Sequence, residues 1–292
     1  MFDPKVLRSV LFVPATNEKL LESAVRRNAD AVQLDLEDAI LGPEKEAARK
    51  AANGAIGWLE GRSPYVVVRI NAPIRMAVRD LEAVVIPGLH AITVPKVPNA
   101  PFLTLLDETI GELEAERGLE AGSVGLIAQI ETPGGLAHIN EIAASTPRLK
   151  ALTIGPEDLA VSLGAQTTLD AMYVPNVLAL TAARCAGIIP LGYIGSITLY
   201  DDQQTYREWI VRAAALGFEG AFCIHPNQVA ICNEVFQPSG DEVEAARRLM
   251  EAFANQAAQG VGVFSFEGRM VDAPIVDRAR AILARAEVIR GR

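Results

Sequence analysis

The chain has few of the residues that mark secreted, membrane-spanning or thiolate-metal proteins. Its 292 residues include three cysteines and three histidines. Cys185, Cys223 and Cys232 match no zinc or redox spacing, so we interpret them as incidental thiols of a reducing compartment. No uncharged apolar run approaches a membrane span, and the N-terminus lacks the charged and apolar regions of a signal peptide. We therefore expect a soluble, cytoplasmic protein.

Positive charge is also scarce. The 27 lysines and arginines are outnumbered by 36 aspartates and glutamates, which gives a net charge of −9. This balance argues against a nucleic acid or an anionic membrane as partner. A polyanionic small molecule would need a local group of basic side chains. With 50% hydrophobic residues, the chain has enough apolar material for one large core.

Eight short β-like stretches recur along the first four fifths of the chain, and segments able to form helices separate them. This alternation predicts an α/β fold with a parallel sheet, and eight units indicate a closed (β/α)8 TIM barrel. The expected strands are Leu11–Ala15, Ala31–Asp38, Tyr65–Asn71, Ala91–Val97, Val124–Glu131, Leu149–Asp158, Ile188–Ser196 and Gly220–His225.

The pattern changes after the eighth stretch. A long Ala-, Glu- and Arg-rich helix is expected at Asp241–Gln259, followed by a hairpin around Glu267-Gly268 and a final helix at Pro274–Arg290. We therefore predict a barrel at 1–235 and a helical extension at 236–292. An extension of this size has too small a core to stand alone, so it should pack on the barrel or on a neighbouring subunit.

Most of the expected strands run into polar or charged residues at their C-terminal ends, where the active site of such a barrel lies. Side chains of a strand alternate between its two faces, so the polar members should point together toward the barrel axis. The residues expected to converge there are Asp35, Glu37, Arg69, Lys96, Glu131, Asp158 and His225.

Several carboxylates grouped around one arginine favour a bound cation. Mg²⁺ takes oxygen ligands and is commonly held by one or two carboxylates. Glu131 and Asp158, which end the fifth and sixth expected strands, form the best ligand pair. Asp35, Glu37 and Asp38 would then orient metal-bound water.

The remaining candidates each have an alternative interpretation. Arg69 presents a planar fork suited to a substrate carboxylate, or it forms a structural ion pair with Asp35 or Glu37. Lys96 balances the acidic charge, or it is a Schiff-base nucleophile of a metal-free aldolase. His225 contacts a ligand or has a structural role.

With these residues in view, the chain resembles the citrate lyase β-subunit-like branch of the HpcH/HpaI aldolase family. The similarity spans nearly the whole chain. The matching motifs are RSVLFVPA at 8–15, DAVQLDLEDAI at 30–40, VVRINAP at 67–73, VPKV at 94–97, IAQIETPGGL at 127–136, IGPEDLAVSLG at 154–164, IHPNQV at 224–229 and GRMVDAP at 268–274.

The resemblance implies roles for these positions. It makes Glu131 and Asp158 the Mg²⁺ ligands and Arg69 the residue that binds the carboxylate of a 2-oxo acid. Glu37 and Asp38 would lie beside the metal. Three further substrate contacts are expected at Lys19, which aligns with a basic residue near coenzyme A in relatives, and at Lys96 and His225.

Asp272, in the C-terminal VDAP motif, is similar to the catalytic acid/base of acyl-CoA lyases in this family. There the residue reaches the barrel of a neighbouring subunit, which suggests a homo-oligomer, with a trimer favoured. From the residues alone, Asp272 would be interpreted as a helix cap ahead of Pro274.

The reaction implied is reversible, Mg²⁺-dependent cleavage of a 3-hydroxyacyl-CoA of the malyl-, citramalyl- or citryl-CoA type. The products would be an acyl-CoA such as acetyl-CoA and a 2-oxo acid. Three alternatives stay open: a metal-dependent aldolase acting on free hydroxy-oxo acids, a citrate lyase subunit acting on a carrier-protein thioester, and a non-enzymatic relative that kept the barrel as a scaffold.

Overall fold

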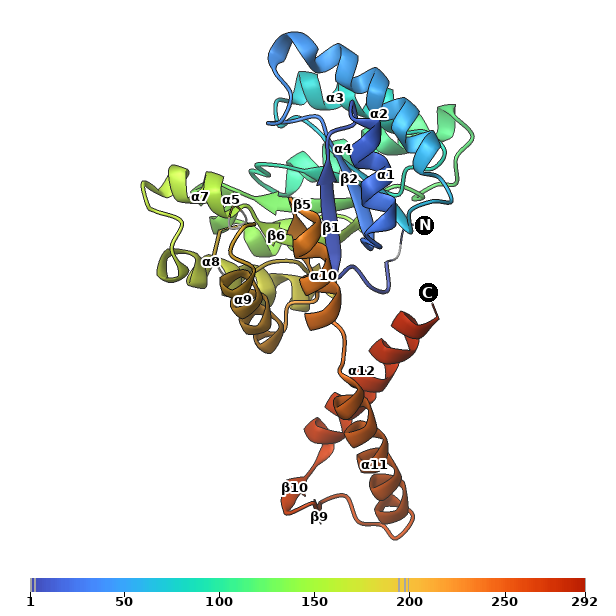
Figure 1. The fold of residues 1–292 in the computed structure, drawn as a ribbon, viewed down its shortest axis with the longest axis vertical. Coiled ribbons are helices and arrows are strands. Elements are labelled where there is room, and N and C mark those ends of the chain that lie inside the picture. The colour runs from blue at the N-terminus through green and yellow to red at the C-terminus, as the bar shows by residue number, and fades with distance from the viewer. Residues whose placement is uncertain (1, 3, 194, 197, 199, 292) are drawn as a thin grey trace. The chain divides into compact units, whose positions relative to one another are not determined.

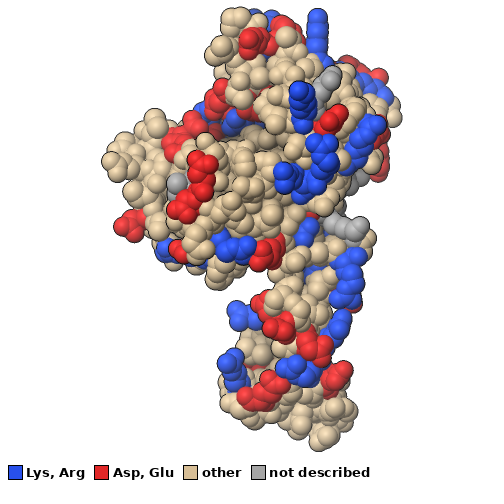
Figure 2. All heavy atoms as spheres, viewed as in Figure 1, with Lys and Arg blue, Asp and Glu red and all other residues tan. Residues whose placement is uncertain are grey.

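The structure is a computed structural model that describes residues 2, 4–193, 195–196, 198 and 200–291. It divides into two compact units, Met1–Phe236 and Gln237–Arg292. None of the helices in the described part of the chain is both long and apolar enough to cross a membrane. On the face drawn in Figure 2, lysines and arginines lie interspersed with acidic side chains.

The first unit is built on eight parallel strands (Figure 1). The strands are β1 (Ser9–Val13), β2 (Ala31–Asp35), β3 (Tyr65–Arg69), β4 (Ala91–Val94), β5 (Gly125–Ile130), β6 (Leu149–Ile154), β7 (Ile189–Pro190) and β8 (Ala221–Cys223). Each of β1 to β6 pairs with the next strand along the chain, and β1 also pairs with β8. A parallel bridge from Leu191 to Gly220 joins the two remaining edges. The predicted (β/α)8 barrel is confirmed.

Helices connect the strands and cover the outside of the sheet. They are α1 (Glu18–Arg26), the 3₁₀ turn η1 (Gly42–Glu44), α2 (Lys45–Leu59), α3 (Ile74–Val84), α4 (Ala100–Glu116), α5 (Pro133–Ala137), α6 (Ile139–Ala143), α7 (Pro156–Leu163), α8 (Leu169–Ala186), α9 (Gln203–Leu216) and α10 (Pro226–Val235). Several begin at a side chain that accepts a backbone N–H of the first turn. Asn17, Asn99 and Thr168 cap α1, α4 and α8 in this way.

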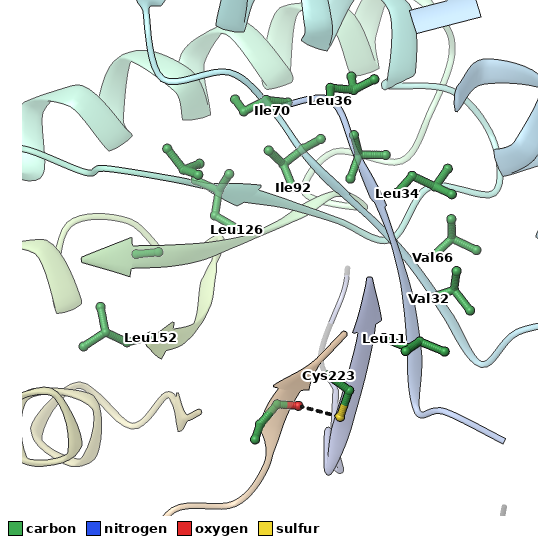
Figure 3. Close-up of a cluster of buried hydrophobic side chains, with 14 of the residues drawn as sticks. Leu11, Val32, Leu34, Leu36, Val66, Ile70, Ile92, Leu126, Leu152 and Cys223 are labelled. Atoms are coloured by element: carbon green, nitrogen blue, oxygen red, sulfur yellow. Dashed lines mark hydrogen bonds between the residues drawn. The ribbon is translucent and has the colours of Figure 1, made fainter. Parts of the chain in front are cut away.

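The outward face of the sheet forms the main core. Figure 3 shows Val32, Leu34 and Leu36 of the β2 region beside Val66 and Ile70 of the neighbouring β3 region. All five side chains are almost completely buried. Because successive strand residues alternate between faces, this apolar outer set directs Gln33 and Asp35 toward the inside of the barrel.

The inward face changes character along each strand. At its N-terminal end it is apolar, with one residue from each strand region: Val10, Ala31, Val67, Ala91, Ile127, Ala151, Leu191 and Phe222. Two residues further along, Gln33, Thr93, Gln129 and Thr153 form a polar level. Two residues beyond Gln33 and Gln129, the inward face presents the charged side chains of Asp35 and Glu131. An apolar floor therefore separates the charged level from the opposite end of the barrel.

Several predicted boundaries are wrong, chiefly because the strands are shorter than their apolar runs. The segment between β5 and β6 contains two short helices, α5 and α6, which meet at His138. β7 contains two residues, whereas the sequence predicted Ile188–Ser196, a range that includes residue 194, outside the described chain. The short β7 is sufficient because the bridge from Leu191 to Gly220 completes the closure of the barrel.

The second unit is a small α/β hairpin assembly. Helix α11 (Gly240–Ala257) and helix α12 (Ala273–Arg290) pack on each other around an apolar group that includes Leu249, Val271 and Val276. The antiparallel strands β9 (Phe264–Phe266) and β10 (Arg269–Val271) join them. Their turn is the predicted Glu267-Gly268, and both residues have positive φ, as tight hairpins require.

The three cysteines differ in exposure. Cys185 on α8 is exposed, whereas Cys223 on β8 and Cys232 on α10 are buried. The Sγ atoms of Cys223 and Cys232 lie 3.7 Å apart. Burial raises the pKa of the Cys223 thiol well above its ordinary value, which disfavours the reactive thiolate.

The close approach of β8 to β1 at Gly220 can be tested by adding a single carbon atom. A Cβ at Gly220 would lie 1.8 Å from the carbonyl oxygen of Leu7, so Gly220→Ala must displace backbone where β8 meets β1. We expect this substitution to cost about 1–3 kcal/mol or more, the range of core overpacking. The measurement is the midpoint of thermal unfolding by circular dichroism.

The matched control is Gly54→Ala, on the exposed surface of α2. No described atom lies within 4 Å of a Cβ there, and alanine is the better helix former, so this variant should gain roughly 0.5–1 kcal/mol. Equal stability of the two variants would contradict the close approach of β8 to β1.

Candidate active site

Asp35 and Arg69 end neighbouring strands and are register partners, so their side chains meet inside the barrel. Nε and Nη2 of Arg69 donate hydrogen bonds of 2.8 and 2.7 Å to the two carboxylate oxygens of Asp35. Burial alone would raise the pKa of Asp35, but the hydrogen bonds and charge of Arg69 hold it below its ordinary value. The ring of Phe12 lies 4.9 Å from the guanidinium carbon. Arg69 is therefore fixed as a charged, oriented fork.

Glu37 and Asp38 lie on the loop that follows β2. Lys45 holds this loop by donating to the carbonyl oxygens of Leu36 and Glu37, at 2.7 and 2.6 Å. The Asn71 amide donates to the carbonyl of Leu36 as well, at 2.9 Å. The Glu37 side chain is buried and the Asp38 side chain is exposed. The loop thus presents one enclosed carboxylate and one solvated carboxylate at the barrel mouth.

Glu37 is shared between two cations. Its Oε2 lies 2.9 Å from Nη1 of Arg69, an ion pair without the alignment of a hydrogen bond, and its Oε1 accepts a bond of 2.7 Å from Nζ of Lys96. Burial raises the pKa of Glu37 overall, although both cations oppose the increase. A buried carboxylate of this kind is a strained member of the site, with lone pairs still unused.

Lys96 follows β4 in a left-handed backbone conformation, with φ of +51°. In this geometry its backbone N–H donates to Oε2 of Glu131 at 2.7 Å. Its Nζ lies 3.5 Å from Oδ1 of Asp158 and 3.7 Å from Oδ2 of Asp38. One residue therefore contacts acidic side chains that come from three different βα loops.

Glu131 directly follows β5, and its side chain is almost fully buried. Its Oε1 accepts from Nε2 of Gln129 at 2.8 Å. A Cβ at Gly155 would lie 2.3 Å from the same oxygen, so only glycine leaves room for this carboxylate. Burial, followed by the negative charges of Glu37 and Asp158, raises the pKa of Glu131 to about 8.

The predicted position of Asp158 at a strand end is wrong. Strand β6 ends at Ile154, and Pro156 begins helix α7, whose first turn contains Asp158. Proline is favoured at this first helical position because its missing N–H has no intrahelical partner there. Asp158 nevertheless reaches Lys96 at the barrel mouth, and its side chain is 40% exposed. The structure thus brings Asp158 to the predicted place from a different element.

Five carboxylates and two cations meet at this end of the barrel: Asp35, Glu37, Asp38, Glu131 and Asp158 against Arg69 and Lys96. Burial is the main cause of the raised pKa of Glu131, and the excess of negative charge adds to it. Oxygen donors with uncompensated charge are what Mg²⁺ requires, so the residues present fit a divalent cation. The described residues contain no converging set of three or more acidic, histidine or cysteine ligands. Such a cation would therefore depend on two carboxylates and on oxygen atoms of other molecules.

A cavity of about 370 Å³ opens at the same place, within the size range of small-molecule sites. Its charged lining residues include Asp35, Arg69, Glu131 and Asp158. Its apolar lining residues include Phe12, Ile154, Phe222 and Ile224, together with the ring of Tyr193. A ligand that carries both a carboxylate and an apolar group matches this mixed lining.

Among the described contacts, neither His225 nor Lys19 pairs with a member of the charged group. The Nδ1 atom of His225 accepts the backbone N–H of Asn227 and caps α10. Its ring stacks on Tyr200 with centroids 5.6 Å apart. The structural alternative for His225 therefore has direct support, and the prediction that it joins the acidic cluster does not. Lys19 lies on the exposed side of α1.

Asp272 belongs to the second unit, at the N-cap position of α12. Within the described chain its side chain makes no capping hydrogen bond, although the position is the one that a cap would occupy. The helix-cap interpretation therefore does not account for this carboxylate.

Glu157 lines the cavity beside Asp158, and sequence reasoning gave it no role. Its carboxylate accepts from Thr167 at 2.7 Å and also from the Ser196 hydroxyl. It thus links the loop after α7 with the loop after β7. In the sequence, the motif GPED shows two adjacent acidic residues. Their spacing alone does not distinguish a metal ligand from a residue that holds two loops together.

Comparison with known proteins finds relatives that match most of the chain. The family described as HpcH/HpaI aldolase/citrate lyase matches residues 8–226. Citrate lyase subunit beta of Escherichia coli K12 is 36% identical over 96% of this chain and 93% of its own length. L-malyl-CoA/beta-methylmalyl-CoA lyase of Rhodobacter capsulatus is 31% identical over 97% of this chain and 95% of its own length.

Solved structures are similar over the same extent. The protein CitE from Mycobacterium tuberculosis, in complex with magnesium, acetoacetate and coenzyme A, has a TM-score of 0.75 and 30% sequence identity. The alignment covers 96% of this chain and 97% of that one. The similarity therefore extends over both units.

The raised pKa of Glu131 predicts how the metal-free protein responds to pH. The folded protein keeps this proton up to about pH 8, whereas an unfolded glutamate loses it near its ordinary pKa of about 4.3. The folded state then binds more protons, so stability falls as pH rises through this window. Thermal unfolding in EDTA at pH 5 to 9 should show this fall for the wild type and a smaller one for Glu131→Gln.

The Glu131→Gln variant keeps an acceptor for the Lys96 N–H. Rotation of the Gln129 amide, whose oxygen has no described partner, would satisfy the new NH₂ group. Glu116→Gln, on the exposed surface of α4, is the control and should follow the wild type. If the melting temperature of Glu131→Gln fell with rising pH as steeply as that of the wild type, Glu131 would not be the source of the pH dependence.

Proposed function

Because the chain belongs to the HpcH/HpaI aldolase/citrate lyase family, we propose that it reversibly cleaves a 3-hydroxyacyl-CoA into an acyl-CoA and a 2-oxo acid, with Mg²⁺ as cofactor. The chain is a carbon–carbon lyase related to enzymes of coenzyme A thioesters. The main support for this specific reaction is that Arg69, Glu131 and Asp158 line the same cavity.

Arg69 would bind the substrate carboxylate. Asp35 engages Nε and Nη2 with one hydrogen bond each, and Glu37 lies 2.9 Å from Nη1 without an aligned hydrogen bond, so the N–H groups of Nη1 and the second N–H of Nη2 would donate to the substrate carboxylate. Guanidinium and carboxylate match as planar groups, and the buried ion pair with Asp35 prevents the fork from rotating. Arg69 thereby fixes the end of the substrate at which a 2-oxo acid is released.

Glu131 and Asp158 would hold the cation, with Glu37 and Asp38 beside it. When bound, the cation supplies Lewis-acid stabilisation of the negative charge that develops on the substrate oxygen during cleavage. Gly155 and the Lys96 N–H keep the Glu131 carboxylate in place. The apolar side chains of Phe12 and Phe222 and the ring of Tyr193, which line the cavity, would exclude water from the two carbon atoms whose bond is broken.

Asp272 is the proposed acid/base. Cleavage leaves a carbanion-like thioester carbon that must gain a proton, and a carboxylic acid that makes no capping hydrogen bond among the described residues is suited to deliver it. We propose that Asp272 acts in a neighbouring subunit of a homo-oligomer, with a trimer favoured. Lys19 is the proposed contact to the phosphates of coenzyme A, and His225 and Lys96 are proposed substrate contacts.

The second candidate is a citrate lyase subunit that acts on a carrier-protein thioester. The 36% identity to citrate lyase subunit beta of Escherichia coli favours it. In that case the isolated chain would not turn over free coenzyme A thioesters.

Incubation with Mg²⁺ and malyl-, citramalyl- or citryl-CoA tests both candidates. Release of acetyl-CoA together with glyoxylate, pyruvate or oxaloacetate, identified by mass spectrometry, would establish the first. No cleavage of any free thioester, at Mg²⁺ concentrations that shift the melting temperature, would exclude it and favour the carrier-protein substrate.

The role of Asp272 predicts complementation between two inactive variants. Asp272→Asn and Glu131→Gln should each lose at least about a hundredfold in turnover, since each removes a chemical function. If Asp272 serves a neighbour, mixed oligomers formed by co-expression contain sites with both native residues. About one quarter of the sites would be intact under random mixing. The measurement is turnover per subunit in the mixed preparation.

Asp277→Asn, on the exposed surface of the same helix, is the matched control and should retain wild-type turnover. A mixed preparation as inactive as its components would place Asp272 in its own subunit's site or outside the chemistry.

A further inference from the structure

Three acidic side chains lie close to the ammonium group of Lys96. Its Nζ lies 2.7 Å from Glu37 and 3.5 Å from Asp158. Asp38 is 3.7 Å away. Glu37 is buried, and its second oxygen has no aligned hydrogen bond among the described residues. Among the ion pairs of the described residues, this ammonium group is the cation that contacts Asp158, one of the two proposed metal ligands.

The same residue also orients the other proposed ligand. The backbone of Lys96 is left-handed, a conformation that is unfavourable for a residue with a Cβ. This geometry directs the N–H toward Oε2 of Glu131 while the side chain extends toward Glu37 and Asp158. A glycine could adopt the backbone with less strain, so the side chain itself must have a use.

Charge balance suggests that use. Without Lys96, the nearby described cations facing the five carboxylates would be Arg69 and Lys45, and Lys45 is engaged with the carbonyl oxygens of Leu36 and Glu37. Interactions between charges at such separations are worth several kcal/mol when partly shielded from water. The acidic side chains of Glu37, Glu131 and Asp158 would therefore repel one another whenever no divalent cation is present.

We propose that Lys96 is an internal counter-ion that neutralises the metal-free site and competes with the divalent cation for the Asp158 carboxylate. This inference deepens the proposed function and rests on the proposed metal site. Binding of the cation would weaken the Lys96–Asp158 contact and leave Lys96 on Glu37 and Asp38. The lysine would stabilise the barrel before metal binding and reduce the affinity for the metal.

Two measurements on Lys96→Met test the inference, and neither uses catalysis. Methionine keeps the length of the side chain and removes its charge. The melting temperature in EDTA should fall below that of the wild type. Titration calorimetry with MgCl₂ at one fixed pH should give a Kd about tenfold lower than that of the wild type, as expected when a neighbouring cation is removed.

Two controls separate this effect from a general change in charge. Lys96→Arg keeps the positive charge, so its Kd for Mg²⁺ should stay within about twofold of the wild type. Lys50→Met removes a positive charge from the exposed side of α2 and should also leave the Kd unchanged. If Lys96→Met is too unstable in EDTA, the double variant with Glu37→Gln removes the stranded carboxylate and should restore the melting temperature.

An unchanged or higher Kd for Mg²⁺ in Lys96→Met would overturn the inference, as would an unchanged melting temperature in EDTA. A wild type that binds no Mg²⁺ would overturn both this inference and the metal-dependent part of the proposed function. A lower Kd in Lys96→Met, in a protein that cleaves no thioester, would support the inference and contradict the proposed function.

Discussion

Mutual repulsion among the carboxylates at the barrel mouth is the constraint on which the rest of the site depends. Glu131 is buried beside Glu37 and Asp158, and its burial together with these two negative charges raises its pKa to about 8. The local structure compensates in specific ways. Asp35 is neutralised by a two-bond ion pair with Arg69, and Gly155 makes space for the Glu131 carboxylate. Each of these features stabilises a carboxyl group whose burial would otherwise be unfavourable.

The barrel places these carboxylates at its open end, where a ligand can reach them. Its inward face changes from the apolar floor near Val67 and Ile127 to the amide level at Gln33 and Gln129, and then to the charged mouth. A closed apolar floor keeps water out on one side, which strengthens every electrostatic interaction above it. The side that remains open is the one where the βα loops contribute polar groups, as expected for this fold.

Much of this arrangement could be predicted from the sequence, because the two-residue period of a strand depends only on local geometry. That period correctly placed Asp35 and Arg69 on one face. It failed for Asp158, because the apolar run of β6 passes into helix α7 through a Gly-Pro pair that resembles a strand end. The left-handed backbone of Lys96 and the fit of Gly155 against Glu131 arise from contacts between loops far apart in the chain, which no local pattern encodes.

The uneven exposure of the thiols has a practical consequence. Cys185 is the exposed cysteine, and the other two are enclosed by β8 and α10. A maleimide fluorophore should therefore attach at a single point on the barrel of the native protein, without any cysteine having to be removed. Paired with a second dye introduced on the surface of α11, it would report by energy transfer how the separation of the two units responds to substrate.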